Sequence, residues 1–209
     1  MRHSPKETVE SWLRHNTLDP HRLIPALLQT QHLPLSPLSP NYAVHYLNRV
    51  VFDSGSTSPM IHNLLLTFLA SSASLQSISS PMVSPNKLPT GASTPDTRSG
   101  MKPDFGSPAD RPLLRFLSTA PKNPITSRPY YDLDYALRLC KRNKRLSACV
   151  HIYAQMEMWE ESVELALQIG DVELAKTYAD KPESDEILQK KLWLMIAKYV
   201  VQDKKDIKS

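Results

Sequence analysis

Four glutamates in the last third of the chain come closest, by type and spacing, to a chemical site. Glu157, Glu160, Glu161 and Glu164 follow one another at i, i+3, i+4 and i+7, the spacing of one helix face. Carboxylates of this kind can bind metal ions in a helical bundle, where Glu-x-x-His pairs complete the site. No such pair occurs here, and His151 lies six residues before the first glutamate. The pattern therefore favours a solvated helix face, with an acidic protein-docking surface as the alternative.

A basic run, KRNKR at Lys141–Arg145, is a candidate nuclear-localisation signal or phosphate-binding patch. We favour another interpretation, because the run falls where a helix that starts near Asp132 should end. Cations suit the helix dipole there, and Asn143 can adopt the left-handed conformation that ends a helix. Cys140 and Cys149 fall on apolar stripes nearby and are predicted to be small buried residues.

Other chemical signatures are missing from the sequence. The seven histidines have no ligand spacing, and there is no nucleophile elbow, P-loop or dinucleotide fingerprint. Five glycines among 209 residues also disfavour phosphate-cradling loops. We therefore expect no catalytic residue, no metal, no cofactor and no enzymatic activity.

The bulk composition indicates a cytosolic protein. Two cysteines make a disulfide framework implausible, which favours a reducing compartment. No apolar run reaches the roughly 20 residues that span a bilayer, and the first residues lack the apolar core of a signal peptide. Residues 1–131 carry a net charge of +5 and residues 132–209 a net charge of −1, a weaker asymmetry than nucleic-acid binding requires.

Helical periodicity occupies two parts of the chain, residues 4–70 and 113–205. Ser4 is a candidate cap for the first helix, Pro25 should kink the second, and Ser184 is a candidate cap for the last. The predicted helices are about 10 to 18 residues long and are joined by short turns, so neighbours must pack antiparallel. The predicted fold is all-α, an α-solenoid of antiparallel helical hairpins.

Residues 71–112 interrupt this pattern with ten serines and seven prolines. Such a composition buries too little apolar surface to offset the entropy of ordering, so a disordered Ser/Pro-rich insertion is predicted. Its Ser-Pro and Thr-Pro steps are candidate phosphorylation sites at Ser80, Ser84, Thr94 and Ser107.

The last predicted helix has apolar residues on more than one side. A stripe of five apolar residues, beginning at Leu188 and ending at Tyr199, should face the preceding helices. Trp193 and Val200 are expected to point elsewhere. We therefore predict that Trp193 and Val200, together with the acidic face of Glu157, Glu160, Glu161 and Glu164, form the partner-contact surface.

The sequence YDLDYALRLCKRNKRLSACVHIYAQMEMWEESVELALQIGDVELAKTYADKP, followed by KKLWLMIAKYVVQ, resembles the clathrin-heavy-chain-repeat solenoid of the vacuolar protein sorting-associated protein 18 family. RLIPALLQ and IHNLLL resemble the same region, so the resemblance covers residues 4–70 and 111–205. Members of this family are core subunits of the HOPS and CORVET membrane-tethering complexes.

The resemblance implies a non-catalytic scaffold in vesicle fusion and in endosome-to-vacuole or lysosome fusion, with the other HOPS/CORVET core subunits as partners. It also implies a cytoplasmic protein that reaches late endosome and vacuole or lysosome membranes only through its complex. Two alternatives stay open: a tetratricopeptide-like adaptor that binds peptides, and a helical-repeat nucleic-acid binder.

Overall fold

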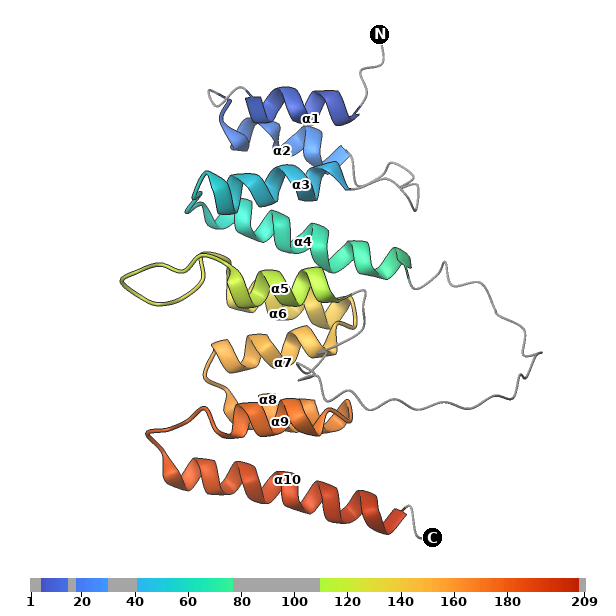
Figure 1. Cartoon of the computed structure of the whole chain (residues 1–209), viewed down its shortest axis with the longest axis vertical. Coiled ribbons are helices and arrows are strands. Elements are labelled where there is room, and N and C mark those ends of the chain that lie inside the picture. Colours follow the sequence, from blue (N-terminus) through green and yellow to red (C-terminus); the bar gives the residue numbers. More distant parts are fainter. Residues whose placement is uncertain (1–4, 15–17, 30–40, 77–109, 207–209) are drawn as a thin grey trace, which may run out of the picture.

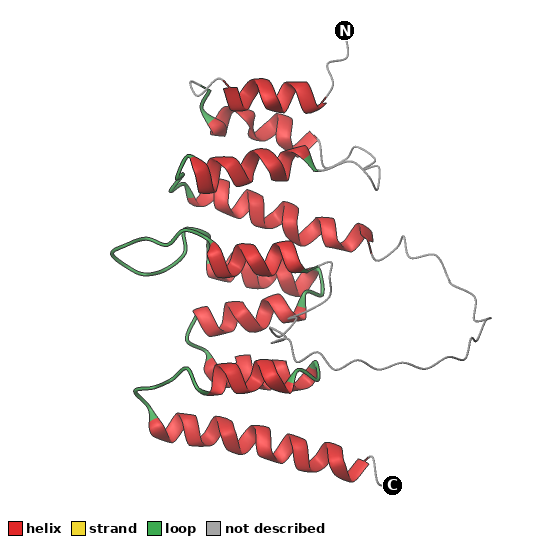
Figure 2. Ribbon diagram, in the orientation of Figure 1, coloured by secondary structure: helices red, strands yellow, loops and turns green. Residues whose placement is uncertain are grey.

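The computed structural model describes residues 5–14, 18–29, 41–76 and 110–206. Its helices are α1 (Pro5–Arg14), α2 (Pro20–Gln29), α3 (Tyr42–Asn48), a π-helical turn (Arg49–Asp53), α4 (Pro59–Gln76), α5 (Arg111–Thr119), α6 (Leu133–Arg142), α7 (Leu146–Gln155), α8 (Trp159–Gln168), α9 (Val172–Ala179) and α10 (Glu186–Asp206). The described residues contain no β-strand, only an isolated antiparallel bridge between Lys122 and Pro129 (Figure 2). The all-α prediction is confirmed.

The helices stack one below another like the rungs of a ladder, from α1 at one end to α10 at the other (Figure 1). Each helix packs against its neighbours in the stack: α4 contacts α5 and α6, α7 contacts α5, α6 and α8, and α10 contacts α8 and α9. This is the arrangement of an α-solenoid, in which a core runs along the stack instead of filling a globule.

Two apolar clusters make up this core. The larger one runs from Val9 in α1 to Ile152 in α7, and the smaller one runs from Val150 in α7 to Ile196 in α10. Because Ile152 belongs to the larger cluster and Val150 to the smaller one, α7 lies between the two clusters and contributes to both. Ile61, Leu65 and Phe68 of α4 are among the fully buried residues of the larger cluster.

Three successive turns, each between neighbouring helices from α6 to α9, are built alike. Helices α6, α7, α8 and α9 begin thirteen residues apart, at residues 133, 146, 159 and 172. Each turn holds one residue at positive φ: Lys144 at 56°, Glu157 at 61° and Gly170 at 79°. Each turn also closes the hydrogen-bond pair of a Schellman motif, the 6→1 bonds being Arg145 N to Cys140 O, Met158 N to Tyr153 O, and Asp171 N to Ala166 O. These helices therefore form a 13-residue structural repeat.

Two sequence predictions about helix ends are wrong by one residue. The left-handed exit of α6 is at Lys144, since Asn143 has φ −89° and its side-chain amide donates to Leu139 O. The cap of α10 is Asp185, whose Oδ1 accepts from Leu188 N at 3.0 Å, because the helix begins at Glu186 and Ser184 is one position too early.

Three further predictions concern Pro25, the Ser4 cap and the Ser/Pro-rich insertion. Pro25 lies inside an unbroken α2, and the Ser4 cap lies outside the described residues. Most of the predicted insertion, including its candidate phosphorylation sites, also lies outside them. Both of its ends belong to helices, however, because α4 extends to Gln76 and α5 begins at Arg111.

Candidate partner-contact surfaces

The four glutamates do not share one helix face. Glu157 lies in the turn between α7 and α8, in the left-handed conformation, because the 13-residue repeat places a turn there. Glu160 is partly exposed and accepts a 2.6 Å hydrogen bond from Lys191 Nζ, which ties α8 to α10. Glu160, Glu161 and Glu164 all lie on α8, and Glu161 and Glu164 are the two exposed ones. The predicted acidic face therefore loses Glu157, and its exposed part is the Glu161–Glu164 pair.

That pair borders a shallow hollow of about 280 Å³ between α6, α7 and α8. Lys141 also lines the hollow, with its ammonium 5.2 Å from the centre of the Tyr153 ring. A hydrogen bond with Tyr153 is the main cause that raises the pKa of Lys141, so the ammonium form is favoured. The lining of the hollow thus combines two carboxylates with one ammonium group.

The KRNKR run, Lys141–Arg145, covers the end of α6 and the turn before α7. Lys141 and Arg142 lie in the last turn of α6, as predicted, where cations complement the helix dipole. Arg145, which the sequence analysis did not distinguish from the others, is buried and pairs with Asp110 at 3.0 Å. No local pattern could have shown this pair, because its members are 35 residues apart.

The predicted apolar contact residues of α10 are only partly correct. The Trp193 side chain is 39% exposed, but its Nε1 donates a 3.0 Å hydrogen bond to Asp180 Oδ1. Val200 packs against the smaller core cluster, so its prediction as an outward residue is wrong. The reason is helical geometry, since Val200 lies next to Tyr199 and Ile196 on the buried side.

A different apolar stripe on α10 is exposed. Ile187 is 82% exposed, Leu194 55% and Val201 54%. These residues lie seven positions apart and therefore share one side of the helix. That side is roughly opposite the buried Leu192 and Ile196. The seven-residue spacing was present in the sequence and was missed.

The loop between α5 and α6 presents a further apolar residue. It projects from one edge of the stack (Figure 1), and Ile125 near its tip is 91% exposed. The loop is internally bonded: Asn123 N donates to Arg128 O, and Asn123 Oδ1 accepts from Ile125 N, both at 2.8 Å. The Ile125 side chain is thus held outward by an organised turn.

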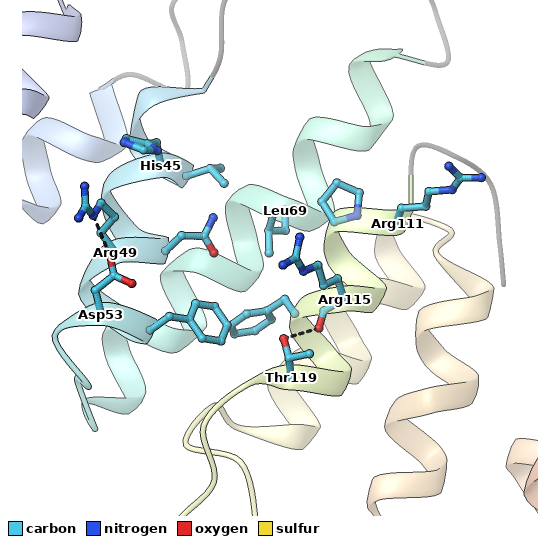
Figure 3. A pocket seen from close by; sticks show the side chains of 12 residues that line it. His45, Arg49, Asp53, Leu69, Arg111, Arg115 and Thr119 are labelled. Atoms are coloured by element: carbon cyan, nitrogen blue, oxygen red, sulfur yellow. Dashed lines mark hydrogen bonds and ion pairs between the residues drawn. The ribbon is translucent and has the colours of Figure 1, made fainter. Parts of the chain in front are cut away.

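A larger cleft of about 720 Å³ opens between α3, the π-helical turn, α4 and α5 (Figure 3). Phe52 and Phe116 form part of its surface and contact each other edge to face, with ring centres 6.3 Å apart. Arg49 and Arg115 also line it, and Arg49 Nε donates to Asp53 Oδ2 at 2.8 Å. The cleft joins aromatic surface to an excess of positive charge.

Two histidines are packed in the solenoid. His62 is fully buried, its Nε2 donates to Ser56 O at 2.7 Å, and burial lowers its pKa. His151 contacts the Tyr178 hydroxyl through Nδ1, and burial likewise lowers its pKa. Both are therefore favoured as neutral groups. Within the described ranges, no three His, Cys, Asp or Glu side chains gather as metal ligands would.

The cysteines are buried, as predicted. Cys140 and Cys149 are both fully inaccessible, and burial raises their pKa to about 12 and about 11 respectively. In the described part of the chain, no helix combines the length and the apolar character needed to traverse a membrane.

Stacked helical hairpins with exposed loops and helix faces define an α-solenoid, a class of extended binding scaffold. The chain belongs to the VPS18 family: it matches the model described as "VPS18, alpha-solenoid domain, second half" over residues 1–87 and 106–201. The internal gap in this match, residues 88–105, falls inside the predicted Ser/Pro-rich insertion. The family resemblance read from the sequence is confirmed.

Individual relatives are similar in sequence over nearly the whole of this chain. The chain is 38% identical to the vacuolar protein sorting-associated protein 18 homolog of Danio rerio over 209 residues, 100% of this chain and 17% of that protein. It is 39% identical to vacuolar sorting protein 18 of Arabidopsis thaliana over 97% of this chain and 17% of the relative. The vacuolar membrane protein pep3 of Schizosaccharomyces pombe is 32% identical over 99% of this chain and 19% of the relative. The chain thus spans about a fifth or less of the length of these relatives.

Proposed function

We propose that this chain is a non-catalytic scaffold segment of a membrane-tethering complex subunit of the HOPS and CORVET type. One observation carries the proposal: the match to the VPS18 solenoid covers both helical parts, on either side of the insertion. The names of the matched relatives refer to vacuolar sorting and the vacuolar membrane, and they support the same proposal.

The physical role of the segment is that of a spacer with docking surfaces. A solenoid places successive helices along one axis, so it holds the elements at its two ends apart while its sides and turns stay available. We propose the other HOPS/CORVET core subunits as partners, in vesicle fusion and in endosome-to-vacuole or lysosome fusion. The site of action would be the cytoplasmic face of late endosomes and vacuoles or lysosomes, reached through the complex.

The proposed contact residues come from three surfaces: the Glu161–Glu164 pair, the loop tip at Ile125, and the α10 stripe of Ile187, Leu194 and Val201. Their features support the proposal, because an organised surface that combines apolar and charged residues is typical of protein interfaces. Glu157, Glu160, Trp193 and Val200 lie beside these surfaces, and we expect them to contribute less.

Co-purification with each core subunit tests the proposal. The 209-residue chain is co-expressed with one tagged subunit at a time, and we expect at least one subunit to retain it. A Glu161→Lys, Glu164→Lys double variant and an Ile125→Asp variant locate the contact. Glu173→Lys is the control, since Glu173 is exposed on α9 and pairs only with Lys176 of the same helix.

Two results would count against the proposal. One is failure of every subunit to retain the chain, both alone and within the full-length protein. The other is retention that is equally strong for an unrelated helical-repeat protein.

A further inference from the structure

The cleft between α3 and α5 has a composition suited to a ligand with two features. Its aromatic and aliphatic surface comes from Phe52, Leu69 and Phe116, and its cations come from Arg49, Arg111 and Arg115. Among the described residues, the one acidic side chain that lines it is that of Asp53, which is paired with Arg49. Its volume of about 720 Å³ lies in the range of roughly 300–1,000 Å³ that is usual for ligand sites.

The backbone presents an aromatic ring in this cleft. Residues Arg49–Asp53 form a π-helical turn at the end of α3, closed by a 3.0 Å bond from Ser54 N to Arg49 O. Single π turns inside helices are rare and are frequent at functional sites. Phe52, within this turn, is 41% exposed although it touches the buried Phe116. An aromatic side chain is thus offered to solvent beside apolar surface.

Arg115 supplies the charge for recognition. Figure 3 shows its side chain directed from α5 toward the centre of the cleft, near Leu69, whereas Arg111 extends away. Among the described residues, no carboxylate lies within ion-pair distance of the Arg115 guanidinium. A guanidinium binds a carboxylate or a phosphate through paired, charge-assisted hydrogen bonds.

We propose that this cleft binds an acidic peptide segment of a partner protein, with an apolar side chain seated against Phe52 and an anionic group on Arg115. A bare anion would leave the exposed aromatic surface uncovered, and an uncharged apolar peptide would offer the Arg115 guanidinium no anion. The anion is a carboxylate or a phosphorylated side chain, since both suit a guanidinium. This activity does not depend on membership of a tethering complex, because it uses only the α3–α5 cleft.

A random library of dodecapeptides displayed on phage tests the proposal with the 209-residue chain as bait. We expect selected peptides to carry an acidic residue within two positions of an aromatic or aliphatic one. Synthetic fluorescein-labelled copies are then titrated by fluorescence anisotropy. Replacing their acidic residues by the amides should weaken binding by about tenfold, and so should raising the salt concentration to 0.5 M. Phosphoserine in place of the acidic residue distinguishes the two sources of the anion.

Variants of the chain place the peptide in the cleft. Arg115→Glu and Phe52→Ala should each weaken binding by at least about tenfold. Their controls are Arg138→Glu, at an exposed arginine, and Leu28→Ala, at an apolar residue about as exposed as Phe52; both lie outside the cleft. Circular dichroism checks that each variant keeps its helix content. A peptide with lysine in place of its acidic residue should bind Arg115→Glu better than the original chain.

The proposal is overturned if the library yields no binding peptide, or if Arg115→Glu and Arg138→Glu bind the selected peptides equally well. Either result would show that the charge and the aromatic surface of the cleft do not act together on a peptide.

Discussion

Asp110 and Arg145 form an ion pair in which Nη1 and Oδ1 are 3.0 Å apart and the two side chains are 11% and 9% exposed. Asp110 immediately precedes α5, and Arg145 lies in the turn between α6 and α7. The pair therefore fixes the start of α5 against the following hairpin. Removal of one partner from a buried ion pair is strongly destabilising, because the other charge stays buried without a counter-charge.

Breaking this pair should unfold the chain more easily. We expect Asp110→Ala to lower the free energy of unfolding by about 3 kcal/mol, because the Arg145 guanidinium stays buried without a counter-charge. Urea denaturation followed by circular dichroism measures the change. Glu173→Ala, which removes the exposed Lys176 pair, is the control and should cost less than about 1 kcal/mol. Equal losses for the two variants would mean that the buried pair has no special weight.

The repeated turns allow a prediction in which glycine stabilises. Glu157 has φ 61°, a conformation that costs an L-residue about 1–2 kcal/mol and that glycine adopts freely. Glu157→Gly should therefore raise the free energy of unfolding by about 0.5–1 kcal/mol, and Lys144→Gly should do the same. Thermal denaturation provides the measurement.

Matched variants separate the turn effect from a general effect of glycine. Glu161→Gly, at an exposed position inside α8, should lower the free energy of unfolding by about 1 kcal/mol. Gly170→Ala should also be destabilising, although nothing lies within 4 Å of the added Cβ, because its φ is 79°. Destabilisation by Glu157→Gly would contradict the Schellman assignment.

The cysteine thiols should be unreactive in the folded chain. Both are fully buried, and burial raises the pKa of Cys140 to about 12 and that of Cys149 to about 11, so almost no thiolate exists near pH 8. Titration with Ellman's reagent should give less than one fast-reacting thiol per chain, and two after addition of urea. Rapid native reaction of either thiol would show that the seam between α6 and α7 opens locally.

The sequence predicted the features that depend on local periodicity. Cys140 and Cys149 fall on apolar stripes, and the structure buries both, because helical spacing alone decides which side of a helix is apolar. The clusters of glutamates and of basic residues were harder to place. Glu157 is separated from the others by a turn, and Arg145 owes its role to an aspartate 35 residues away.

The cleft between α3 and α5 could not be predicted from the sequence for a similar reason. Phe52 and Arg115 belong to segments that lie on either side of the insertion, and only the stacking of α3, α4 and α5 brings them together. The exposed stripe of α10 is a different case. Ile187, Leu194 and Val201 recur every seven residues, but α10 has apolar residues on several sides, and only the packing of α8 and α9 decides which side is covered.

Acidification should weaken the fold through His62, which is fully buried, and His151, which is partly buried. Burial lowers the pKa values of His62 and His151 below 6.5 in the folded chain, so the unfolded chain binds protons more tightly. The free energy of unfolding should therefore be fully maintained above pH 6.5 and should fall as pH drops from about 6.5 toward the folded-state pKa values. Urea denaturation between pH 5 and pH 8 measures this slope.

Variants assign the slope to these residues. His62→Gln and His151→Gln should each reduce it, whereas His21→Gln, at an exposed position of α2, should leave it unchanged. If neither His62→Gln nor His151→Gln changed the dependence of the free energy of unfolding on pH, other groups would control the response to acid.

The exposed stripe of α10 should make the isolated chain self-associate. One side of α10 is covered by α8 and α9, and the opposite side presents Ile187, Leu194 and Val201 to solvent. Exposed apolar residues that share one side of a helix promote association with a second apolar surface. We therefore expect a concentration-dependent increase in mass in sedimentation-equilibrium experiments, and Leu194→Lys should suppress it because it places a charge in the middle of the stripe.

Two further variants separate the stripe from other surface positions. Arg138→Glu reverses a charge at an exposed position of α6, away from α10, and should leave the association largely intact. Trp193→Lys removes the hydrogen bond to Asp180, so it should lower the free energy of unfolding but affect the association less than Leu194→Lys does. If Trp193→Lys suppressed association and Leu194→Lys did not, the contact would lie on the Trp193 side of the helix. A monomer at all concentrations would show instead that three separated apolar residues bury too little area to hold two copies together.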